Sequence, residues 1–183
     1  MTSATQGVVF RRAAVLGAGV MGRAIAAHLA NAGLEVLLLD LPSDGPDRNA
    51  LLNEALRALP KDRPSPIYSR ASMDRISVGN FEDDLERLAD AQWVIEAVVE
   101  RFDIKEKVFA AIAPHLAEDV ILSTNTSGIP LARLAETVPE PLRPRFLGTH
   151  FFNPPRYMHL LEVIGGPQTE PDVVAAIAHA GEF

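Results

Sequence analysis

The chain has 183 residues, of which 48% are hydrophobic and 22% are charged, as is typical of one globular domain with a hydrophobic core. Its net charge of −7 and the lack of a dense basic cluster argue against nucleic-acid binding. The absence of cysteine excludes disulfides and cysteine-ligated metals and fits a cytoplasmic location, and no apolar run approaches the ~18 residues of a membrane-spanning helix. We therefore expect no metal site and no membrane span.

The segment from Arg12 to Asp40 has the pattern of a strand, a glycine turn, a helix and a second strand. Residues 13–16 and 34–39 are short apolar runs, which is typical of buried parallel strands. A helix is expected over 20–31, and Gly33 is placed to end it in the left-handed conformation.

The turn of this segment has the spacing G-x-G-x-x-G, formed by Gly17, Gly19 and Gly22. In this pattern the first glycine permits the tight turn, the second lets the backbone approach a pyrophosphate, and the third lets the helix pack against the strand. Asp40 lies where a carboxylate can accept both ribose hydroxyls and repel a 2′-phosphate, so NAD is favoured over NADP. The predicted cofactor-binding residues of this segment are Gly17, Ala18, Gly19, Val20, Met21, Gly22 and Asp40.

The rest of the chain continues the alternation of strands and helices. Strands are expected over 76–78, 93–99, 120–123, 146–150 and 159–164. Helices are expected over 49–59, 68–75, 81–91, 103–116 (with Asp103 as the N-cap), 130–138 and 171–179. The alternation predicts an α/β fold: a Rossmann-type, doubly wound, mostly parallel sheet with helices on both faces, spanning 12–183 after a flexible terminus over 1–11.

Four basic residues lie in the insertion that follows the second strand: Lys61, Arg63, Arg70 and Arg75. They could contact the phosphates of a coenzyme, but a solvated face is the more common reason for such scattered charge. We favour the solvated face.

Polar residues at or just past the predicted strand ends should meet in one crevice, because ligands bind off the carboxyl ends of parallel strands. These residues are Asp40, Glu100, Ser127 and His150. His150 is a candidate acid–base group, and Glu162 on the next strand could hydrogen-bond its other ring nitrogen. Ser127 could hydrogen-bond a substrate oxygen. A structural histidine and a serine that caps a helix are the alternatives.

Four motifs carry a family resemblance: GAGVMG with Asp40, IEAVVE, STNTSG and GTHFFNPPRYMHLLEVI. They resemble the NAD-binding domain of the L-3-hydroxyacyl-CoA dehydrogenases, from Arg12 to about the end of the chain. The segment NPPRYMHLLE, with SPIYS and ISVGN upstream, is most similar to the long bacterial fusion enzymes. Those enzymes join the dehydrogenase to an enoyl-CoA hydratase region.

The resemblance implies a role for each matching residue. His150 matches the catalytic histidine and Glu162 its carboxylate partner, while Ser127 matches a serine that contacts substrate and cofactor. Asn153 matches an asparagine near the nicotinamide, and Glu100 and Lys105 match cofactor contacts. The implied reaction is the NAD-dependent oxidation of an (S)-3-hydroxyacyl-CoA to a 3-ketoacyl-CoA in fatty-acid β-oxidation. No coenzyme A contact is implied within residues 42–75, which do not follow the pattern of the short enzymes.

The resemblance also implies a helical C-terminal domain for substrate binding and dimerisation, which these residues do not include. We therefore expect this chain to be part of a longer protein, able to bind the cofactor but inactive alone. Three alternatives stay open: a β-hydroxyacid dehydrogenase, which would rely on a catalytic lysine, a non-catalytic NAD(H)-binding module, and a structural protein recruited from the same fold.

Overall fold

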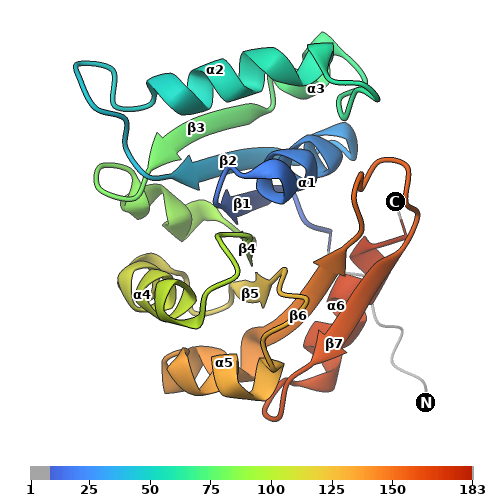
Figure 1. The fold of residues 1–183 in the computed structure, drawn as a ribbon. Coiled ribbons are helices and arrows are strands. Elements are labelled where there is room, and N and C mark those ends of the chain that lie inside the picture. The colour runs from blue at the N-terminus through green and yellow to red at the C-terminus, as the bar shows by residue number, and fades with distance from the viewer. Residues whose placement is uncertain (1–8, 183) are drawn as a thin grey trace.

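A computed structural model describes residues 9–182 as one seven-stranded sheet flanked by helices (Figure 1). The strand order is β3-β2-β1-β4-β5-β6-β7, and every neighbouring pair is parallel except β6 and β7. The strands are β1 (Arg12–Leu16), β2 (Glu35–Asp40), β3 (Ile76–Asn80), β4 (Trp93–Glu96), β5 (Ile121–Thr124), β6 (Phe146–Phe151) and β7 (Leu161–Gly165). The predicted doubly wound, mostly parallel sheet is confirmed.

The helices cover both faces of the sheet, with α4 and α5 on one side and α1 and α6 on the other (Figure 1). Their bounds are α1 (Val20–Asn31), α2 (Ala50–Ala58), α3 (Arg70–Met73), α4 (Phe102–Ile112), α5 (Leu131–Thr137) and α6 (Pro171–Ala180). Short 3₁₀ turns lie at Leu59–Lys61, Leu85–Asp90, Ala113–His115 and Glu140–Arg145. Within residues 9–182, none of the helices combines the length and the apolarity needed to cross a bilayer.

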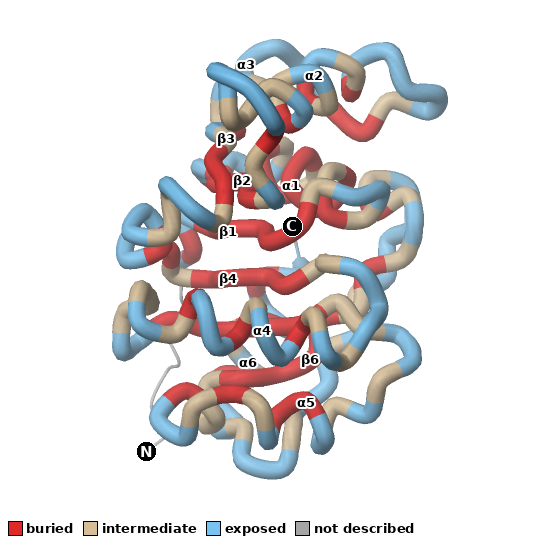
Figure 2. The backbone as a smooth tube through the Cα atoms, turned by 60° about the vertical axis from the view of Figure 1, so that its left-hand side comes forward, coloured by how far each residue is buried: buried red, intermediate tan, exposed pale blue. Residues whose placement is uncertain are grey.

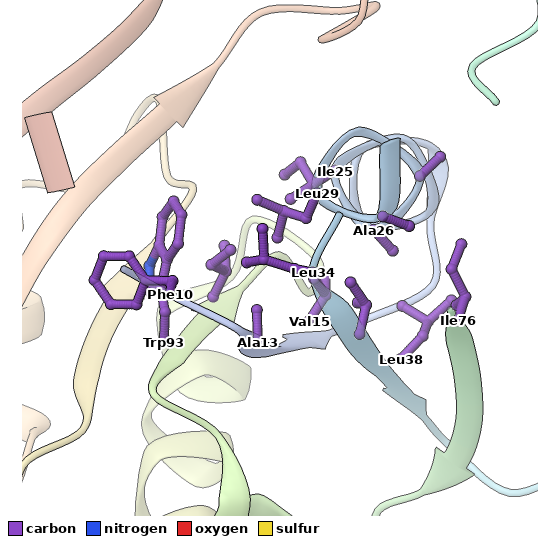
Figure 3. Close-up of a cluster of buried hydrophobic side chains, with 14 of the residues drawn as sticks. Phe10, Ala13, Val15, Ile25, Ala26, Leu29, Leu34, Leu38, Ile76 and Trp93 are labelled. Atoms are coloured by element: carbon purple, nitrogen blue, oxygen red, sulfur yellow. The ribbon is translucent and has the colours of Figure 1, made fainter. Parts of the chain in front are cut away.

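The central strands are buried on both faces, as the burial colours of Figure 2 show for β1 and β4. In β1, Ala13 and Val15 point into the cluster under α1 and α6, while Ala14 and Leu16 point into the cluster under α4 and α5. Figure 3 shows the first cluster, where side chains of α1 pack on β1 and β2. Two apolar layers require apolar residues at successive positions, which explains the unbroken apolar runs in the sequence.

The first βαβ unit agrees closely with the sequence prediction. Helix α1 has the predicted bounds, and Gly33 follows it with a φ of +98°. This is the left-handed conformation that glycine adopts at no steric cost. The local signals of this unit are therefore sufficient to define it.

The helix predicted over 81–91 is wrong. The chain turns after β3 and forms only the 3₁₀ segment Leu85–Asp90. The Asn80 side-chain oxygen accepts the N–H groups of Glu82 and Asp83, both at 3.0 Å. These side-chain bonds compete with the first turn of a helix, so an α-helix does not start there. Leu88 of this segment is nevertheless buried.

Two further boundaries differ from the prediction. Strand β4 ends at Glu96 and not at Val99, because its ladder partner β1 ends at Leu16, where the glycine turn begins. Asp103 is not the N-cap of α4. Arg101 holds that position, and the Asp103 carboxylate in the first turn accepts the Arg101 guanidinium at 2.8 Å.

The flexible terminus predicted over 1–11 lies mostly outside the described residues, which begin at Val9. Phe10, which that prediction places in the terminus, is instead buried and its ring lies 5.7 Å from the ring of Trp93 (Figure 3). Arg11 follows with its N–H donated to the Gln92 side chain at 2.8 Å. The packed part of the chain therefore begins before Arg12.

Replacing Phe10 by alanine tests this packing. We expect Phe10→Ala to lower the free energy of unfolding by about 3 kcal/mol, because it removes a buried ring and leaves a cavity beside Trp93. Val9→Ala is the control, since Val9 is 69% exposed and should change stability by less than about 0.5 kcal/mol. Urea unfolding measures both, and equal stabilities for the two variants would contradict the packed position of Phe10.

Candidate functional site

Two of the three glycines in the turn are required by the fold itself. Gly17 has a φ of +99°, and a Cβ there would lie 2.8 Å from the Ala97 carbonyl oxygen. A Cβ on Gly22 would lie 1.7 Å from the carbonyl oxygen of Gly17. The turn and the first turn of α1 are therefore in direct backbone contact, and a side chain at either glycine would separate them.

Gly19 differs, because no heavy atom lies within 4 Å of the place where its Cβ would be. It is the N-cap of α1, where no side chain caps the helix and the first turn carries no acidic residue. The unpaired N–H groups of a helix N-terminus favour an anion. This open, uncapped backbone fits the diphosphate of a dinucleotide, which the sequence predicted for Gly19 and its neighbours Val20 and Met21.

Asp40 lies beside the same turn, at the end of β2. Its carboxylate accepts the N–H of Ala18 at 2.5 Å and the N–H of the next residue, Leu41, at 2.7 Å. A carboxylate has about four lone-pair sites, so two backbone bonds leave acceptor capacity for the hydroxyls of a ribose. The contact with Ala18 joins the predicted ribose-binding group directly to the predicted diphosphate turn.

His150 and Glu162 lie directly opposite each other in the antiparallel pair of β6 and β7. Opposed residues share one face of a sheet, so the register places the two side chains together. Nδ1 of His150 lies 2.7 Å from Oε2 of Glu162, and the imidazole is 24% exposed. The Phe152 ring packs on the imidazole at 4.7 Å between centroids. Since Nδ1 is engaged, Nε2 is the nitrogen that can exchange a proton with a ligand.

A cavity of about 340 Å³ lies at the carboxyl ends of the strands. Its lining residues are Met21, Ala97, Val98, Glu100, Asn125, Ser127, His150, Phe151, Phe152 and Asn153. Five of them were predicted as site residues from the sequence: Met21, Glu100, Ser127, His150 and Asn153. The glycine turn adjoins this cavity, since Gly17 packs on Ala97.

Sequence reasoning missed three polar or aromatic residues of the cavity, Asn125, Phe151 and Phe152. The Asn125 side-chain oxygen accepts the Phe151 N–H at 2.9 Å, which joins the end of β5 to the end of β6. Asn125 directly follows a buried strand, as Ser127 nearly does, so its position at a strand end was the signal that could have identified it.

Glu100 receives several hydrogen bonds at the edge of the cavity. Its Oε1 accepts the Thr126 hydroxyl, the Ser127 N–H at 3.1 Å and the Gly128 N–H at 2.9 Å. Partial burial alone would raise the pKa of Glu100, but the bonds from Thr126 and Gly128 and the charge of Lys105 outweigh it and lower the pKa to about 2. Glu100 is therefore an anion that holds the Ser127 loop.

Lys105 was predicted as a cofactor contact, but the structure buries it completely behind the cavity wall. Its ammonium lies 2.8 and 2.9 Å from the two Glu96 oxygens and 3.2 Å from Glu100. An ammonium has three donors, and these carboxylate oxygens occupy them. In this structure Lys105 faces protein carboxylates and does not line the cavity, and its contact with the cofactor stays a prediction.

The basic residues of the insertion are placed apart from this cavity. Arg75 pairs with Glu35 at 2.7 Å on the surface, and the Arg63 guanidinium donates to the Lys61 carbonyl at 3.2 Å. Arg70 and Lys61 are exposed. These placements support the interpretation of these residues as a solvated face.

Substitution of the turn glycines should separate folding from binding. Gly19→Ala has space for its methyl group, so its free energy of unfolding should stay within about 1 kcal/mol of the wild type. Its NADH affinity should fall at least about tenfold, because the methyl group occupies the approach to the turn. Gly22→Ala should instead lose at least about 2 kcal/mol of stability, because its Cβ meets backbone. Unfolding curves and NADH fluorescence titrations measure the two effects; normal NADH binding by Gly19→Ala would exclude the turn as the diphosphate site.

The lowered pKa of Glu100 predicts a pH dependence of stability. The pKa is about 2 in the folded chain against an ordinary 4.5, so the anion stabilises the fold above about pH 4.5 and this contribution is lost as the pH falls toward 2. Between pH 4.5 and pH 2 the free energy of unfolding of the wild type should fall by about 1 kcal/mol more than that of Glu100→Gln. This value is set below the full effect of the pKa shift because the Glu100 side chain is 40% exposed and solvent screens its charge. Urea unfolding over this pH range tests it, with the exposed Glu106→Gln as the control. Parallel pH profiles for the wild type and Glu100→Gln would show that Glu100 does not hold the loop as an anion.

The comparisons with known proteins agree with this geometry. The family model described as "3-hydroxyacyl-CoA dehydrogenase, NAD binding domain" matches residues 12–182. A Deinococcus radiodurans protein named "Probable 3-hydroxyacyl-CoA dehydrogenase" is 46% identical over 173 residues, which are 94% of this chain and 50% of that protein. A Bacillus subtilis protein of the same name is 44% identical over 187 residues, 94% of this chain and 24% of that protein. The chain thus spans between a quarter and a half of these relatives.

Solved structures give the same result. The 3-hydroxybutyryl-CoA dehydrogenase of Escherichia coli K12 matches with a TM-score of 0.80 and 30% identity, over 96% of this chain and 36% of that one. The (S)-3-hydroxybutyryl-CoA dehydrogenase of Ralstonia eutropha matches with a TM-score of 0.76 and 32% identity, over 95% of this chain and 60% of that one. The resemblance and the cofactor predicted from the sequence, NAD, are confirmed at the level of the family. The chain belongs to the 3-hydroxyacyl-CoA dehydrogenase family, whose NAD-binding domain it matches over residues 12–182.

Proposed function

We propose that this chain is the cofactor-binding and proton-transferring part of an enzyme that oxidises (S)-3-hydroxyacyl-CoA to 3-ketoacyl-CoA with NAD, in fatty-acid β-oxidation. One observation carries the proposal. One cavity brings the imidazole of His150, with its carboxylate partner Glu162, beside Ser127 and Asn153. Ser127 is the predicted contact of substrate and cofactor, and Asn153 is predicted to lie near the nicotinamide. The glycine turn adjoins the same cavity through Ala97.

His150 acts as the general base in this proposal. Its Nε2 takes the proton of the substrate 3-hydroxyl group, while Glu162 holds Nδ1 and stabilises the imidazolium that forms. The Ser127 hydroxyl donates a hydrogen bond to the same substrate oxygen and holds it in reach of His150. Bound NAD supplies the acceptor for the hydride from C3, so the alcohol loses one proton and one hydride and becomes a ketone.

The rest of the NAD molecule is assigned to the first βαβ unit. The backbone around Gly19 receives the diphosphate, and Asp40 receives the adenosine ribose. Asn153 and Glu100 lie on the cavity at the nicotinamide end. This division places the adenosine half and the nicotinamide half of the cofactor on different loops.

The substrate and partner assignments extend to a longer protein. A Rickettsia felis relative named as a fatty acid oxidation complex trifunctional enzyme is 41% identical over 92% of this chain, which is 24% of that protein. We infer a helical domain that covers the acyl chain, an acyl-CoA substrate and an enoyl-CoA hydratase region in the same polypeptide. A cytoplasmic location belongs to the same proposal.

Substitution of His150 tests the assignment of the base. His150→Gln should bind NADH with the affinity of the wild type, because it changes the proton acceptor and not the cofactor turn. Turnover of a 3-hydroxyacyl-CoA by the longer protein that carries the substitution should fall by about 10²–10⁴-fold. Stopped-flow absorbance of NADH formation measures the rate.

His179→Gln is the matched control, since His179 is an exposed histidine that does not line the cavity. Full turnover by His150→Gln would refute the base and favour a module that binds NAD(H) without catalysing a reaction.

A further inference from the structure

A fully buried ion pair lies behind the wall of the cavity. Glu96 ends β4 and Lys105 lies in the first half of α4, and both side chains have 0% exposure. The Lys105 ammonium lies within 2.9 Å of both Glu96 carboxylate oxygens. Neither residue lines the cavity, so the proposed mechanism uses neither of them directly.

The Glu96 carboxylate is bonded to two of the segments that build the cavity. One oxygen accepts the Val98 N–H at 2.7 Å, and the other accepts the Thr124 hydroxyl at 2.5 Å. The Glu96 backbone carbonyl also accepts the Asn125 N–H at 2.7 Å. One residue thus fixes the segment after β4 and the segment after β5.

Lys105 extends these contacts to the serine loop. Its ammonium lies 3.2 Å from Glu100, whose other oxygen accepts the N–H groups of Ser127 and Gly128. A continuous chain of charge-assisted contacts therefore runs from Glu96 through Lys105 and Glu100 to the loop of Ser127. Charge-assisted hydrogen bonds are short and directional, so they can fix the position of a backbone segment.

Stability alone is a weak reason for such a pair. Removing two charges from water is expensive, and well-packed apolar residues of similar volume often give an equally stable or more stable protein. An apolar pair could not reach the Val98 N–H, the Thr124 hydroxyl and Glu100 together. What the charged pair provides, and an apolar pair would not, is a set of bonds that fix the segments of the cavity wall.

We propose that Glu96 and Lys105 are positioning residues that hold Val98, Glu100 and Ser127 in the arrangement that receives the nicotinamide half of the cofactor. This inference depends on the proposed function, which places the nicotinamide in that cavity. The bonds of the pair do not extend to Asp40 or Gly19, so we expect a smaller effect on the adenosine half of the cofactor than on the nicotinamide half.

The double variant Glu96→Met/Lys105→Met tests the proposal, because it replaces both charges together with unbranched side chains of similar length. Binding of NADH and of ADP-ribose, which lacks the nicotinamide, is measured by isothermal titration, and folding by thermal denaturation. We expect a folded variant with a lowered melting temperature, because the Val98 N–H and the Thr124 hydroxyl lose their acceptor. The NADH Kd should rise at least about tenfold, while the ADP-ribose Kd should stay within about twofold.

Several outcomes would overturn the proposal. An NADH Kd equal to that of the wild type, or equal losses for NADH and ADP-ribose, would show that the pair has only a structural role. Lys107→Met, an exposed residue of the same helix, is the control and should change neither affinity. If the double variant does not fold, Thr124→Val removes one bond to Glu96 at similar volume and should raise the ratio of the NADH Kd to the ADP-ribose Kd about threefold. No change in that ratio contradicts the proposal.

The same titrations separate this proposal from the proposed function. If the wild type binds NADH and ADP-ribose equally well, the cavity does not receive the nicotinamide, and both proposals fail. If the wild type prefers NADH and the double variant keeps that preference, only the positioning proposal fails. The assignment of His150 is decided apart from both, by turnover of its own variant.

Discussion

The site depends on one close backbone contact, between the start of α1 and the glycine turn. Because Gly22 has no Cβ, α1 can lie against the carbonyl of Gly17, and Gly17 in turn lies against Ala97. The first contact directs the helix N-terminus at the edge of the sheet, where an anion is favoured. The second joins this anion site to the wall of the cavity. A dinucleotide bound at the turn is thereby brought to the edge of the cavity that contains His150.

The last two strands bring His150 and Glu162 together by a different geometric rule. Antiparallel pairing of β6 with β7 sets His150 opposite Glu162, and the parallel part of the sheet could not do so with one short connection. The antiparallel edge strand is thus the element that turns a nucleotide-binding sheet into one with an oriented imidazole. The cavity also contains Glu100, which stays ionised because hydrogen bonds and Lys105 lower its pKa to about 2. This anion accepts the N–H groups of Ser127 and Gly128 and so holds the serine loop.

The sequence was sufficient wherever a local rule decided the outcome. Spacing alone predicted α1 and the left-handed Gly33. The rule that ligands bind at strand ends predicted one crevice for Asp40, Glu100, Ser127 and His150, and the last three do line one cavity, whereas Asp40 lies outside its lining. Sequence reasoning failed where a contact distant in sequence or a side-chain bond decided the outcome. The Asn80 side chain prevents the helix expected after β3, and Trp93 buries Phe10 in what was expected to be a loose terminus. The spacing of hydrophobic residues along the sequence predicts neither of these contacts.

Lys105 illustrates the same limit at the site. A lysine on a helix is solvated in most proteins, and only the folded chain shows that its ammonium lies between Glu96 and Glu100. The sequence did contain a signal, because Glu96 interrupts an apolar run where a buried carboxylate requires a cation or several donors. A charged residue within a buried strand therefore predicts an oppositely charged partner on a neighbouring element. Here that partner lies nine positions later, and its ammonium also lies 3.2 Å from Glu100, which accepts the N–H of Ser127. The carboxylate within the apolar strand is thus bonded, through Lys105 and Glu100, to a loop at the cavity.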